Sequence, residues 1–280
     1  MTLIEGKTVS AAVKARIKAE TERRCITPCL AVIIVGSDPA SRVYVNNKKK
    51  ACEATGMRSL EFALPEETSE AQLLSLIDRL NADNGVHGVL CQLPLPKHID
   101  EQAVIDRISP AKDADCFHPV NVGKLWTGGA AFLPCTPAGV IELLRYYKID
   151  CAGKNCVIIG RSNIVGKPMA ALMLQENATV TVCHSKTKDL AKVCAGADIL
   201  ICAIGKPKFV TADMVKEGAA VIDVGINRDE NGNLCGDVDF ESVSKKAGFL
   251  TPVPGGCGPM TIAMLMQNTL AAFDLQQGQS

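Results

Sequence analysis

Two blocks of this sequence alternate between strand-like and helix-like patterns, and this alternation constrains the fold more than any other feature. Three segments of the first block have the character of strands in a parallel sheet: residues 30–35, 59–64 and 88–93. Apolar residues at helical spacing predict helices over residues 10–24, 41–55 and 69–80. Strands that alternate with helices in this way favour a parallel sheet with helices on its faces.

The second block has the same character and follows a connecting segment. Residues 109–137 are rich in glycine, proline and short polar residues, which is typical of a connection between domains. Helices are then predicted over residues 137–147, 165–174, 188–194 and 212–217. Strands are predicted over residues 155–159, 179–183, 199–203 and 219–224.

These patterns predict two doubly wound α/β domains. We place the first domain at residues 1–118 together with 260–280, because a long helix predicted over 259–273 is expected to return to it. The second domain is placed at residues 119–259.

Composition and charge exclude several classes of protein. The formal net charge of the 280 residues is zero, which argues against nucleic acid as a partner. There is no run of about 18 apolar residues, and the first residues lack the apolar segment of a secretory signal, so no membrane association is expected. The 13 cysteines show no C-x-x-C spacing, which favours reduced core thiols in a cytoplasmic protein and no metal cluster.

The segment that begins Gly160-Arg161-Ser162 and ends at Pro168 follows a predicted strand and opens a predicted helix. A dinucleotide site needs a tight turn at this place, so that the pyrophosphate meets free N–H groups at the helix N-terminus. The spacing is G-x-S-x-x-x-G instead of the usual G-x-G-x-x-G. An ordinary strand-to-helix turn is the alternative interpretation.

The end of the next predicted strand lacks the acidic residue of NAD-specific sites. His184, Ser185 and Lys186 follow that strand instead. Together with Arg161 they offer donors that complement a 2′-phosphate, which predicts NADP as the cofactor. The alternative is a solvated loop with incidental basic residues.

Three further segments carry side chains suited to a ligand site. Tyr44 and Lys48 are four residues apart and so share one face of a predicted helix. Gln92 and Leu93 stand at the end of a predicted strand, where α/β sheets place ligands. Asp115 belongs to a polar loop that also contains His118. Taken singly, each is better explained as a structural loop or a solvated helix face than as a functional site.

Taken together, the motifs resemble one family, the methylenetetrahydrofolate dehydrogenase/cyclohydrolase family of the bacterial bifunctional type. The matching stretches, in order, are residues 44–48, 92–96, 112–119, 160–168, 223–227 and 251–261. Their length, unusual composition and order extend the resemblance over almost the whole chain.

The resemblance implies a function and an architecture. It implies oxidation of 5,10-methylene-tetrahydrofolate to the 5,10-methenyl compound with NADP, followed by hydrolysis to 10-formyl-tetrahydrofolate. It implies a folate-binding catalytic domain first and a Rossmann-like NADP-binding domain second, with an active-site cleft between them. Tetrahydrofolate one-carbon derivatives are then the substrates, and the family implies a homodimer.

The resemblance also implies roles for single residues. Lys48 corresponds to the essential catalytic lysine, Tyr44 to the ring that stacks on the folate, and Gln92 to the residue that tunes the lysine. Asp115 corresponds to the carboxylate that reads the pterin edge, and Leu93 to a neighbouring substrate contact. The implied cofactor contacts are Gly160, Arg161, Ser162, Ser185 and Ile226. The implied wall over the substrate contains Pro254, Gly255 and Gly256.

Two residues depart from the family pattern. Cys116 stands where the family usually has glycine, which puts the local backbone in doubt because cysteine tolerates a positive φ poorly. Cys257 stands where valine is usual.

Two other functions stay open at this point. One is a different NADP-dependent dehydrogenase that acts on another small cyclic substrate. The other is a non-catalytic nucleotide-binding regulator. The joint presence of Tyr44, Lys48, Gln92 and Asp115 argues against both.

Overall fold

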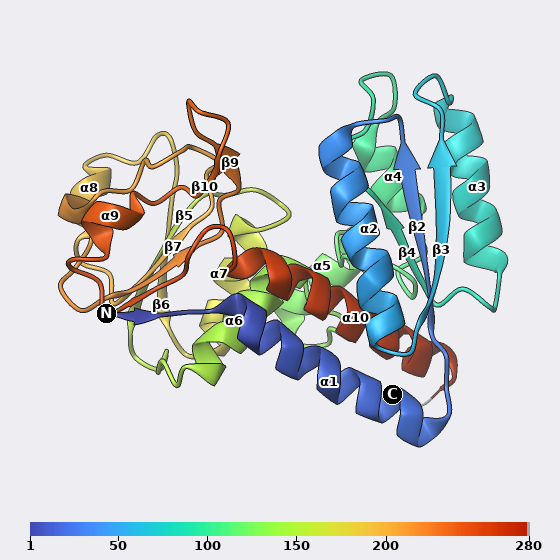
Figure 1. Cartoon of the computed structure of the whole chain (residues 1–280), viewed down its shortest axis with the longest axis horizontal. Coiled ribbons are helices and arrows are strands. Elements are labelled where there is room, and N and C mark those ends of the chain that lie inside the picture. Colours follow the sequence, from blue (N-terminus) through green and yellow to red (C-terminus); the bar gives the residue numbers. More distant parts are fainter. Residues whose placement is uncertain (279–280) are drawn as a thin grey trace. The chain divides into compact units, whose positions relative to one another are not determined.

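The computed structural model describes residues 1–278, apart from the side chains of residues 39 and 40, and it divides into two compact units. One unit, which we call the three-stranded unit, comprises Ala12–Cys135 and the chain from Ile262 onward. The other, the six-stranded unit, comprises Met1–Ala11 and Thr136–Thr261. Figure 1 shows the elements of both.

The three-stranded unit is built on a parallel sheet of order β3-β2-β4. Its strands are β2 (Cys29–Val35), β3 (Arg58–Leu64) and β4 (Gly88–Cys91). Its helices are α1 (Gly6–Arg24), α2 (Pro39–Ala54), α3 (Glu70–Ala82), α4 (Glu101–Arg107), α5 (Pro119–Thr127) and α10 (Cys257–Gln276), of which α1 and α10 begin in the six-stranded unit. Every residue of β2 is buried, because the strand is central and has packed layers on both faces.

Local sequence signals fix the ends of these helices. The Asp38 side chain accepts the Ser41 N–H and so caps α2. Ser69 and Gln72 form a capping box at the start of α3. Gly56 lies just beyond the end of α2 with φ +71°, as expected of a glycine that ends a helix. The predicted helices over 41–55 and 69–80 are therefore confirmed with small shifts at their ends.

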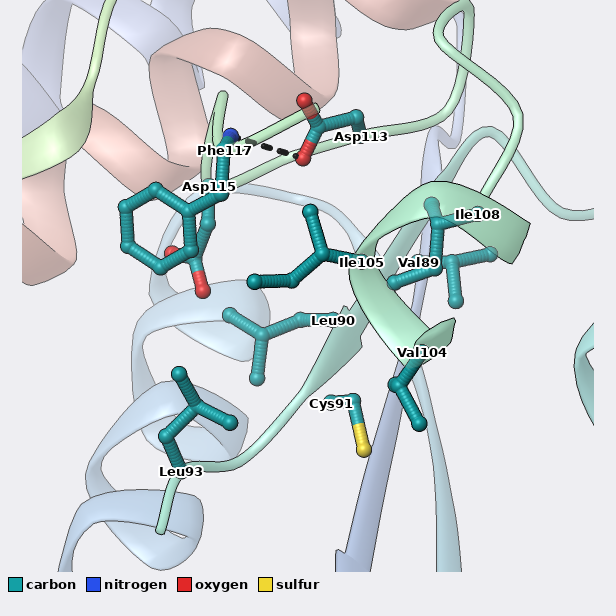
Figure 2. A pocket seen from close by; sticks show the side chains of 10 residues that line it. All are labelled: Val89, Leu90, Cys91, Leu93, Val104, Ile105, Ile108, Asp113, Asp115 and Phe117. Carbon is teal, nitrogen blue, oxygen red and sulfur yellow. Dashed lines mark hydrogen bonds between the residues drawn. The ribbon is translucent and has the colours of Figure 1, made fainter. Parts of the chain in front are cut away.

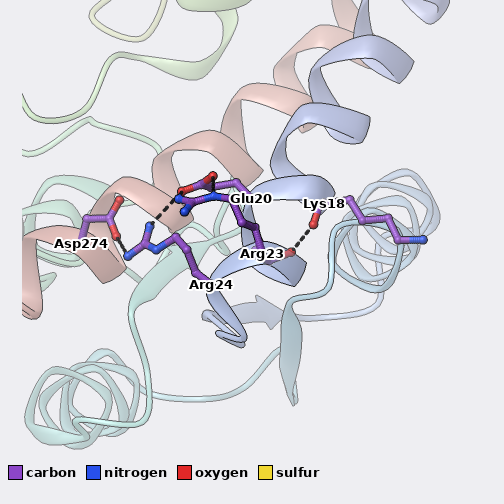
Figure 3. A network of polar contacts seen from close by, with 6 residues as sticks. Lys18, Glu20, Arg23, Arg24 and Asp274 are labelled. Atoms are coloured by element: carbon purple, nitrogen blue, oxygen red, sulfur yellow. Dashed lines mark hydrogen bonds and ion pairs between the residues drawn. The ribbon is translucent and has the colours of Figure 1, made fainter.

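An ion pair joins α1 to α10 within the three-stranded unit (Figure 3). Arg24 Nη2 lies 2.6 Å from Asp274 Oδ1, and the same guanidinium lies over the ring of Phe273. The Phe273 ring also packs against the ring of His87, which precedes β4. The last helix thus packs onto the first predicted domain, as the sequence indicated.

The six-stranded unit has a parallel sheet of order β1-β11-β8-β7-β5-β6. Its strands are β1 (Thr2–Leu3), β5 (Asn155–Ile159), β6 (Thr179–Cys183), β7 (Ile199–Cys202), β8 (Ala220–Asp223) and β11 (Phe249–Leu250). A hairpin of β9 (Asn227–Arg228) and β10 (Leu234–Cys235) follows β8. Its helices are α6 (Cys135–Tyr146), α7 (Gly166–Gln175), α8 (Leu190–Cys194), α9 (Phe240–Val243) and the 3-10 turn η1 (Ala212–Met214).

The strand order of this unit contains a topological switch. The chain passes from β5 to β6 on one side and then returns to β7 on the other side of β5. Ligands of such sheets bind outside the carboxyl ends of the strands where the order reverses. The prediction of two doubly wound α/β domains is confirmed, and the edge beyond β5, β6 and β7 is the place to look for a ligand.

The structure differs from the sequence interpretation in several short elements. Helix α5 lies inside 109–137, which had been interpreted as a connection, and α4 was not predicted. Strand β1 has only two residues, too few for periodicity, and is defined by bonds such as Thr2 N–H to Gly248 O (2.7 Å). The helix predicted over 212–217 is a single 3-10 turn.

The unit boundaries also differ from the expected ones. The chain passes between units at residues 135–136 instead of 118–119, and residues 1–11 belong to the six-stranded unit. Tertiary pairing of β1 with β11 explains the second difference. Within residues 1–278, no helix combines the length and apolar character needed to cross a membrane.

Candidate active site

Lys48 and Gln92 meet at the carboxyl end of β4. Lys48 Nζ, on α2, donates a 2.8 Å hydrogen bond to Gln92 Oε1. Gln92 Nε2 donates to Leu93 O at 2.7 Å, which turns the amide oxygen toward the lysine. The Gln92 N–H bonds to Ile33 O of β2, so the sheet itself fixes this residue. Tyr44 lies one helical turn before Lys48 and is 37% exposed, which leaves its ring available for a flat ligand.

Asp115 lies in a segment that runs beside β4. Residue Asp113 bridges to Val89 of that strand. The Asp113 carboxylate accepts N–H bonds from Phe117 (3.2 Å), His118 (2.9 Å) and the Asn121 side chain (2.9 Å). Asp113 therefore holds the turn that presents Asp115. His118 caps α5 by accepting the Val120 N–H at 3.1 Å, so it has a structural role there.

The electrostatics of Lys48 and Asp115 are coupled. Burial lowers the pKa of Lys48, and the negative charge of Asp115 opposes this effect. Burial raises the pKa of Asp115 to about 6, while Lys48 opposes and Asp113 reinforces that shift. No ion pair joins Lys48 to Asp115 among the described residues. An amine and a carboxyl group with pKa values displaced toward neutrality are suited to proton transfer.

A pocket lies beside Asp115 in the three-stranded unit (Figure 2). It is lined by apolar side chains of β4 and α4, by Leu93 and by the segment that contains Asp113, Asp115 and Phe117. Leu93 and Asp115 belong both to this pocket and to the predicted substrate site, whereas Tyr44, Lys48 and Gln92 do not line it. The apolar lining accounts for the raised pKa of the Asp115 carboxyl group.

Cys116 keeps the backbone conformation that favours glycine. Its φ is +62°, and its side chain is completely buried. The thiol packs with Phe132 and Ala272, and its Sγ lies 3.5 Å from Phe132 O. The doubt about this backbone is thus resolved: the turn is kept, and the cysteine adopts a left-handed conformation that costs a non-glycine residue free energy.

Sequence reasoning missed two neighbours of Asp115. The Cys135 thiol lowers the pKa of Asp115 against the effect of burial, and its Sγ lies 3.4 Å from Ala114 O. Asn268 of α10 donates to Ala114 O (2.9 Å) and to Leu133 O (2.7 Å). These bonds fix the backbone before Asp115. No spacing signal in the sequence points to Asn268, because the contact spans 154 residues.

In the six-stranded unit, Gly160 directly follows β5. Its φ is +129°, and a Cβ atom at this position would collide with Ala203 O after β7. Gly166 opens α7, where a Cβ atom would collide with Gly160 O. Only glycine fits at either position, which explains the glycine spacing of the motif.

The loop offers backbone donors in a different place from the one predicted. Ser162 Oγ accepts the N–H groups of Val165 (3.2 Å) and Gly166 (3.3 Å), and Ser162 O accepts that of Lys167. The first N–H groups of α7 are therefore already bonded, and the expectation of free donors at the helix N-terminus is wrong. Among the described residues, the N–H groups of residues 161–164 make no hydrogen bond.

The remaining predicted cofactor residues lie at the same edge of the sheet. Gly160 N–H bonds to Cys183 O at 2.9 Å, which places the ends of β5 and β6 side by side. Arg161 and Ser185 follow these two strands, and both are exposed. Ile226 follows β8 and is 50% exposed, which is unusual for isoleucine.

The segment with Pro254, Gly255 and Gly256 links β11 to α10 in the six-stranded unit. Gly255 has φ +112° and accepts the Lys7 N–H, and the Gly256 N–H bonds to Pro252 O at 2.8 Å. Cys257 is buried as the first residue of α10. The segment is thus a tight, internally bonded turn.

Two family models match the chain. The model described as "Tetrahydrofolate dehydrogenase/cyclohydrolase, catalytic domain" matches residues 4–115. The model described as "Tetrahydrofolate dehydrogenase/cyclohydrolase, NAD(P)-binding domain" matches residues 134–277. They correspond to the parts of the chain that carry the Lys48 site and the Gly160 loop, respectively.

Relatives match over the whole length. The bifunctional protein FolD of Agathobacter rectalis is 62% identical over 274 residues, which covers 97% of this chain and 98% of that protein. A crystal structure of the bifunctional enzyme FolD-methylenetetrahydrofolate dehydrogenase/cyclohydrolase from Campylobacter jejuni is 53% identical with a TM-score of 0.95, covering 98% of this chain and 99% of that one. The Trypanosoma brucei FolD structure, complexed with NADP cofactor and inhibitor, is 41% identical with a TM-score of 0.93, covering 98% of each chain.

The two family models match successive parts of the chain, and the relatives match it over nearly its whole length. The chain therefore belongs to the tetrahydrofolate dehydrogenase/cyclohydrolase family.

Proposed function

We propose that this chain oxidises 5,10-methylene-tetrahydrofolate with NADP and hydrolyses the methenyl product to 10-formyl-tetrahydrofolate. The observation that carries the proposal is the Lys48–Gln92 hydrogen bond at the carboxyl end of a parallel strand, with Asp115 close enough to shift the pKa of the lysine. The family provides the two reactions, and these residues provide groups that suit them.

The hydrolytic step needs an activated water and a path for protons. The methenyl carbon is already electrophilic, so water attacks it once a proton acceptor is near. Lys48 has a lowered pKa, which increases the fraction of neutral amine near pH 7. Gln92 Oε1 accepts a hydrogen bond from Lys48 Nζ and so fixes the position of that nitrogen. Lys48 is the proposed catalytic residue, and Gln92 is the group that orients it.

The oxidative step depends on alignment. NADP, when bound, supplies the acceptor for the hydride that leaves the methylene carbon. The chain contributes the orientation of the folate: Tyr44 offers a ring face for stacking, and Asp115 offers a carboxylate for the N–H groups of the pterin edge. Leu93 adds an apolar contact beside Asp115.

NADP is proposed over NAD because of the residues at the ends of β5 and β6. Arg161 and Ser185 are exposed donors at neighbouring strand ends, and no acidic residue occupies positions 184–186. The free N–H groups of residues 161–164 suit a phosphate group of the same cofactor. Gly160, Ser162 and Ile226 complete the proposed contacts. The segment of Pro254, Gly255 and Gly256 is proposed to line the substrate.

We also propose a homodimer in the cytoplasm. Strand β6 is an edge of the six-stranded sheet, and Val182 on it and Leu174 on α7 are exposed, which suits pairing with a second copy. The cysteines of the described residues are free thiols and nearly all buried, as in proteins of reducing compartments. The zero net charge supports the absence of a nucleic-acid partner.

A spectrophotometric assay tests the function. The purified protein is given methylene-tetrahydrofolate with NADP or NAD, and reduced cofactor is followed. Supplied methenyl-tetrahydrofolate is followed separately in the absence of cofactor. Both signals are expected, with NADP preferred. A protein that binds NADPH but turns over neither folate would favour the non-catalytic regulator, and the proposal would be abandoned.

A further inference from the structure

Two buried carboxylates, Asp223 and Asp237, lie at the ligand edge of the six-stranded sheet and take no part in the chemistry proposed above. Asp223 ends β8, and Asp237 follows the hairpin of β9 and β10. Asp237 is completely buried, and Asp223 is 3% exposed. Burying a charged group costs free energy unless hydrogen bonds compensate for the lost water, so two such groups indicate a specific role.

The Asp237 carboxylate accepts hydrogen bonds from four donors. Its Oδ2 accepts the N–H groups of Ile204 (2.7 Å) and Gly205 (3.1 Å). Its Oδ1 accepts the Lys206 N–H (2.8 Å) and the Asn227 side-chain amide (2.9 Å). A carboxylate offers about four acceptor positions, so this one is fully used. Three of its donors are consecutive backbone N–H groups, those of residues 204–206 in the turn that follows β7.

Asp223 fixes the backbone around Asp237 through hydrogen bonds. Its Oδ1 accepts the N–H groups of Asp237 (3.0 Å) and Gly225 (2.9 Å), and its Oδ2 accepts that of Val238 (2.9 Å). A Cβ atom at Gly236 would collide with the Asp223 carboxylate, and one at Gly225 would collide with that of Asp237. Both carboxylates therefore have fixed positions.

The segments bonded to Asp237 adjoin the proposed cofactor contacts. Residues 204–206 continue from Ala203, whose carbonyl lies against the backbone of Gly160. Asn227 directly follows the exposed Ile226. A displacement of the 204–206 turn would thus also shift Ala203, against which Gly160 packs. Loss of the Asn227 hydrogen bond would leave the backbone next to Ile226 less fixed.

We propose that Asp237 is a positioning residue of the dinucleotide site, which fixes the turn after β7 and the residue after Ile226 in the geometry that receives the cofactor. The inference rests on the proposed dinucleotide function of this edge. Asp237 touches neither reacting group. It acts through backbone N–H groups that it holds in place.

Asp237→Asn is the sharpest substitution because it preserves size. Whichever oxygen becomes the NH2 group, that group faces two N–H donors and two hydrogen bonds are lost. The lost bonds are either those from Ile204 and Gly205 or those from Lys206 and the Asn227 side chain. NADPH affinity is expected to fall by about tenfold or more. Hydrolysis of supplied methenyl-tetrahydrofolate, measured without cofactor, is expected to stay at the parental rate.

The experiment compares three proteins in their full length. NADPH is titrated by its own fluorescence, and the KM for NADP and the kcat at saturating NADP are measured separately. Asp237→Asn is expected to raise the dissociation constant and the KM more than it lowers kcat. Asp229→Asn is the matched control, since Asp229, between β9 and β10, also accepts backbone N–H groups but bonds only within that hairpin. The control is expected to bind NADPH as the parent does.

A second variant covers the case in which Asp237→Asn does not fold, as judged by circular dichroism. Asn227→Ala removes one of the four donors and leaves the carboxylate in place, so a smaller loss of NADPH affinity with intact hydrolysis is expected. A folded Asp237→Asn protein with parental NADPH affinity, or with equal loss of both activities, overturns this inference alone. A parental protein that does not bind NADPH overturns the proposed function and this inference with it.

Discussion

The two units of the molecule differ in the hydrogen-bond partners of their buried charged groups. In the three-stranded unit, burial lowers the pKa of Lys48 and raises that of Asp115 to about 6, and the Lys48 amine donates to the Gln92 side chain. In the six-stranded unit, burial likewise raises the pKa of Asp223 to about 6, but its backbone N–H bonds oppose that shift. Asp223 and Asp237 fix the backbone through such bonds. A carboxylate surrounded by N–H donors is suited to holding a loop, whereas a buried group with few partners is better suited to moving protons. In the proposed function, the chemistry and the cofactor geometry thus belong to different parts of the chain.

The largest expected effect is that of Lys48→Met, which keeps the length of the side chain and removes the amine. General acid–base assistance typically contributes about 10²–10⁴-fold, so hydrolysis of methenyl-tetrahydrofolate should fall by that factor. In the proposed function, hydride transfer depends on alignment by Tyr44 and Asp115, so it should be partly retained. Methenyl decay and NADPH formation are followed separately.

The neighbouring lysines provide the control for this prediction. Lys49 and Lys50 are exposed, and Lys49→Met and Lys50→Met should hydrolyse at the parental rate. If Lys48→Met also does so, the proposed mechanism and the comparison between the two units both fail.

Arg161→Ala tests the cofactor side of the comparison. A hydrogen bond to a charged group contributes about 1.5–3 kcal/mol, so NADP binding should weaken roughly tenfold to a hundredfold. NAD lacks the 2′-phosphate and should be affected much less. Dissociation constants for both cofactors provide the measurement, and equal weakening of the two would show that Arg161 does not read the phosphate.

The pH dependence of folate binding tests Asp115. Because its pKa in the folded chain is raised to about 6, the carboxylate form becomes populated as pH rises through that value. The KM for methylene-tetrahydrofolate should therefore fall as pH rises through about 6. The same variation in an Asp115→Asn protein, which cannot ionise at this position, would exclude Asp115 as its source.

Stability should respond to the same group with a defined sign. The pKa of Asp115 is about 6 in the folded chain, against an ordinary value of 3.8 for an exposed aspartate, so between these values the unfolded chain binds fewer protons. The contribution of Asp115 to the free energy of unfolding should decrease as pH rises across this interval. Denaturant unfolding of the parent and of Asp115→Asn at a series of pH values measures that contribution by difference.

The smallest expected effect concerns Cys116, and two variants separate strain from packing. Cys116→Ala keeps the Cβ atom in the left-handed conformation and loses the packed sulfur, so it should be less stable than the parent. Cys116→Gly relieves the strain, which costs about 1–2 kcal/mol per residue, and should be at least as stable as the alanine variant with activity intact. A strong loss of folate binding in Cys116→Gly would instead make the cysteine a functional substitution.

The sequence by itself determined the features that repeat or that require special residues. Continuous apolar runs and helical spacing located β2, β5 and the helices around them, because burial on two faces leaves a strong local pattern. The glycine spacing of the 160–166 loop reflects close backbone approaches that no other residue allows. The helix pitch placed Tyr44 and Lys48 on one face.

Only the tertiary structure decided the features that depend on partners distant in sequence. The two-residue strand β1 exists because β11 pairs with it, and residues 1–11 join the six-stranded unit for that reason. The bonds from the 204–206 turn to Asp237 span more than 30 residues, and no periodicity records them. Local sequence encodes which faces are buried, but the direction of a single polar bond is set only when segments far apart in the chain are brought together.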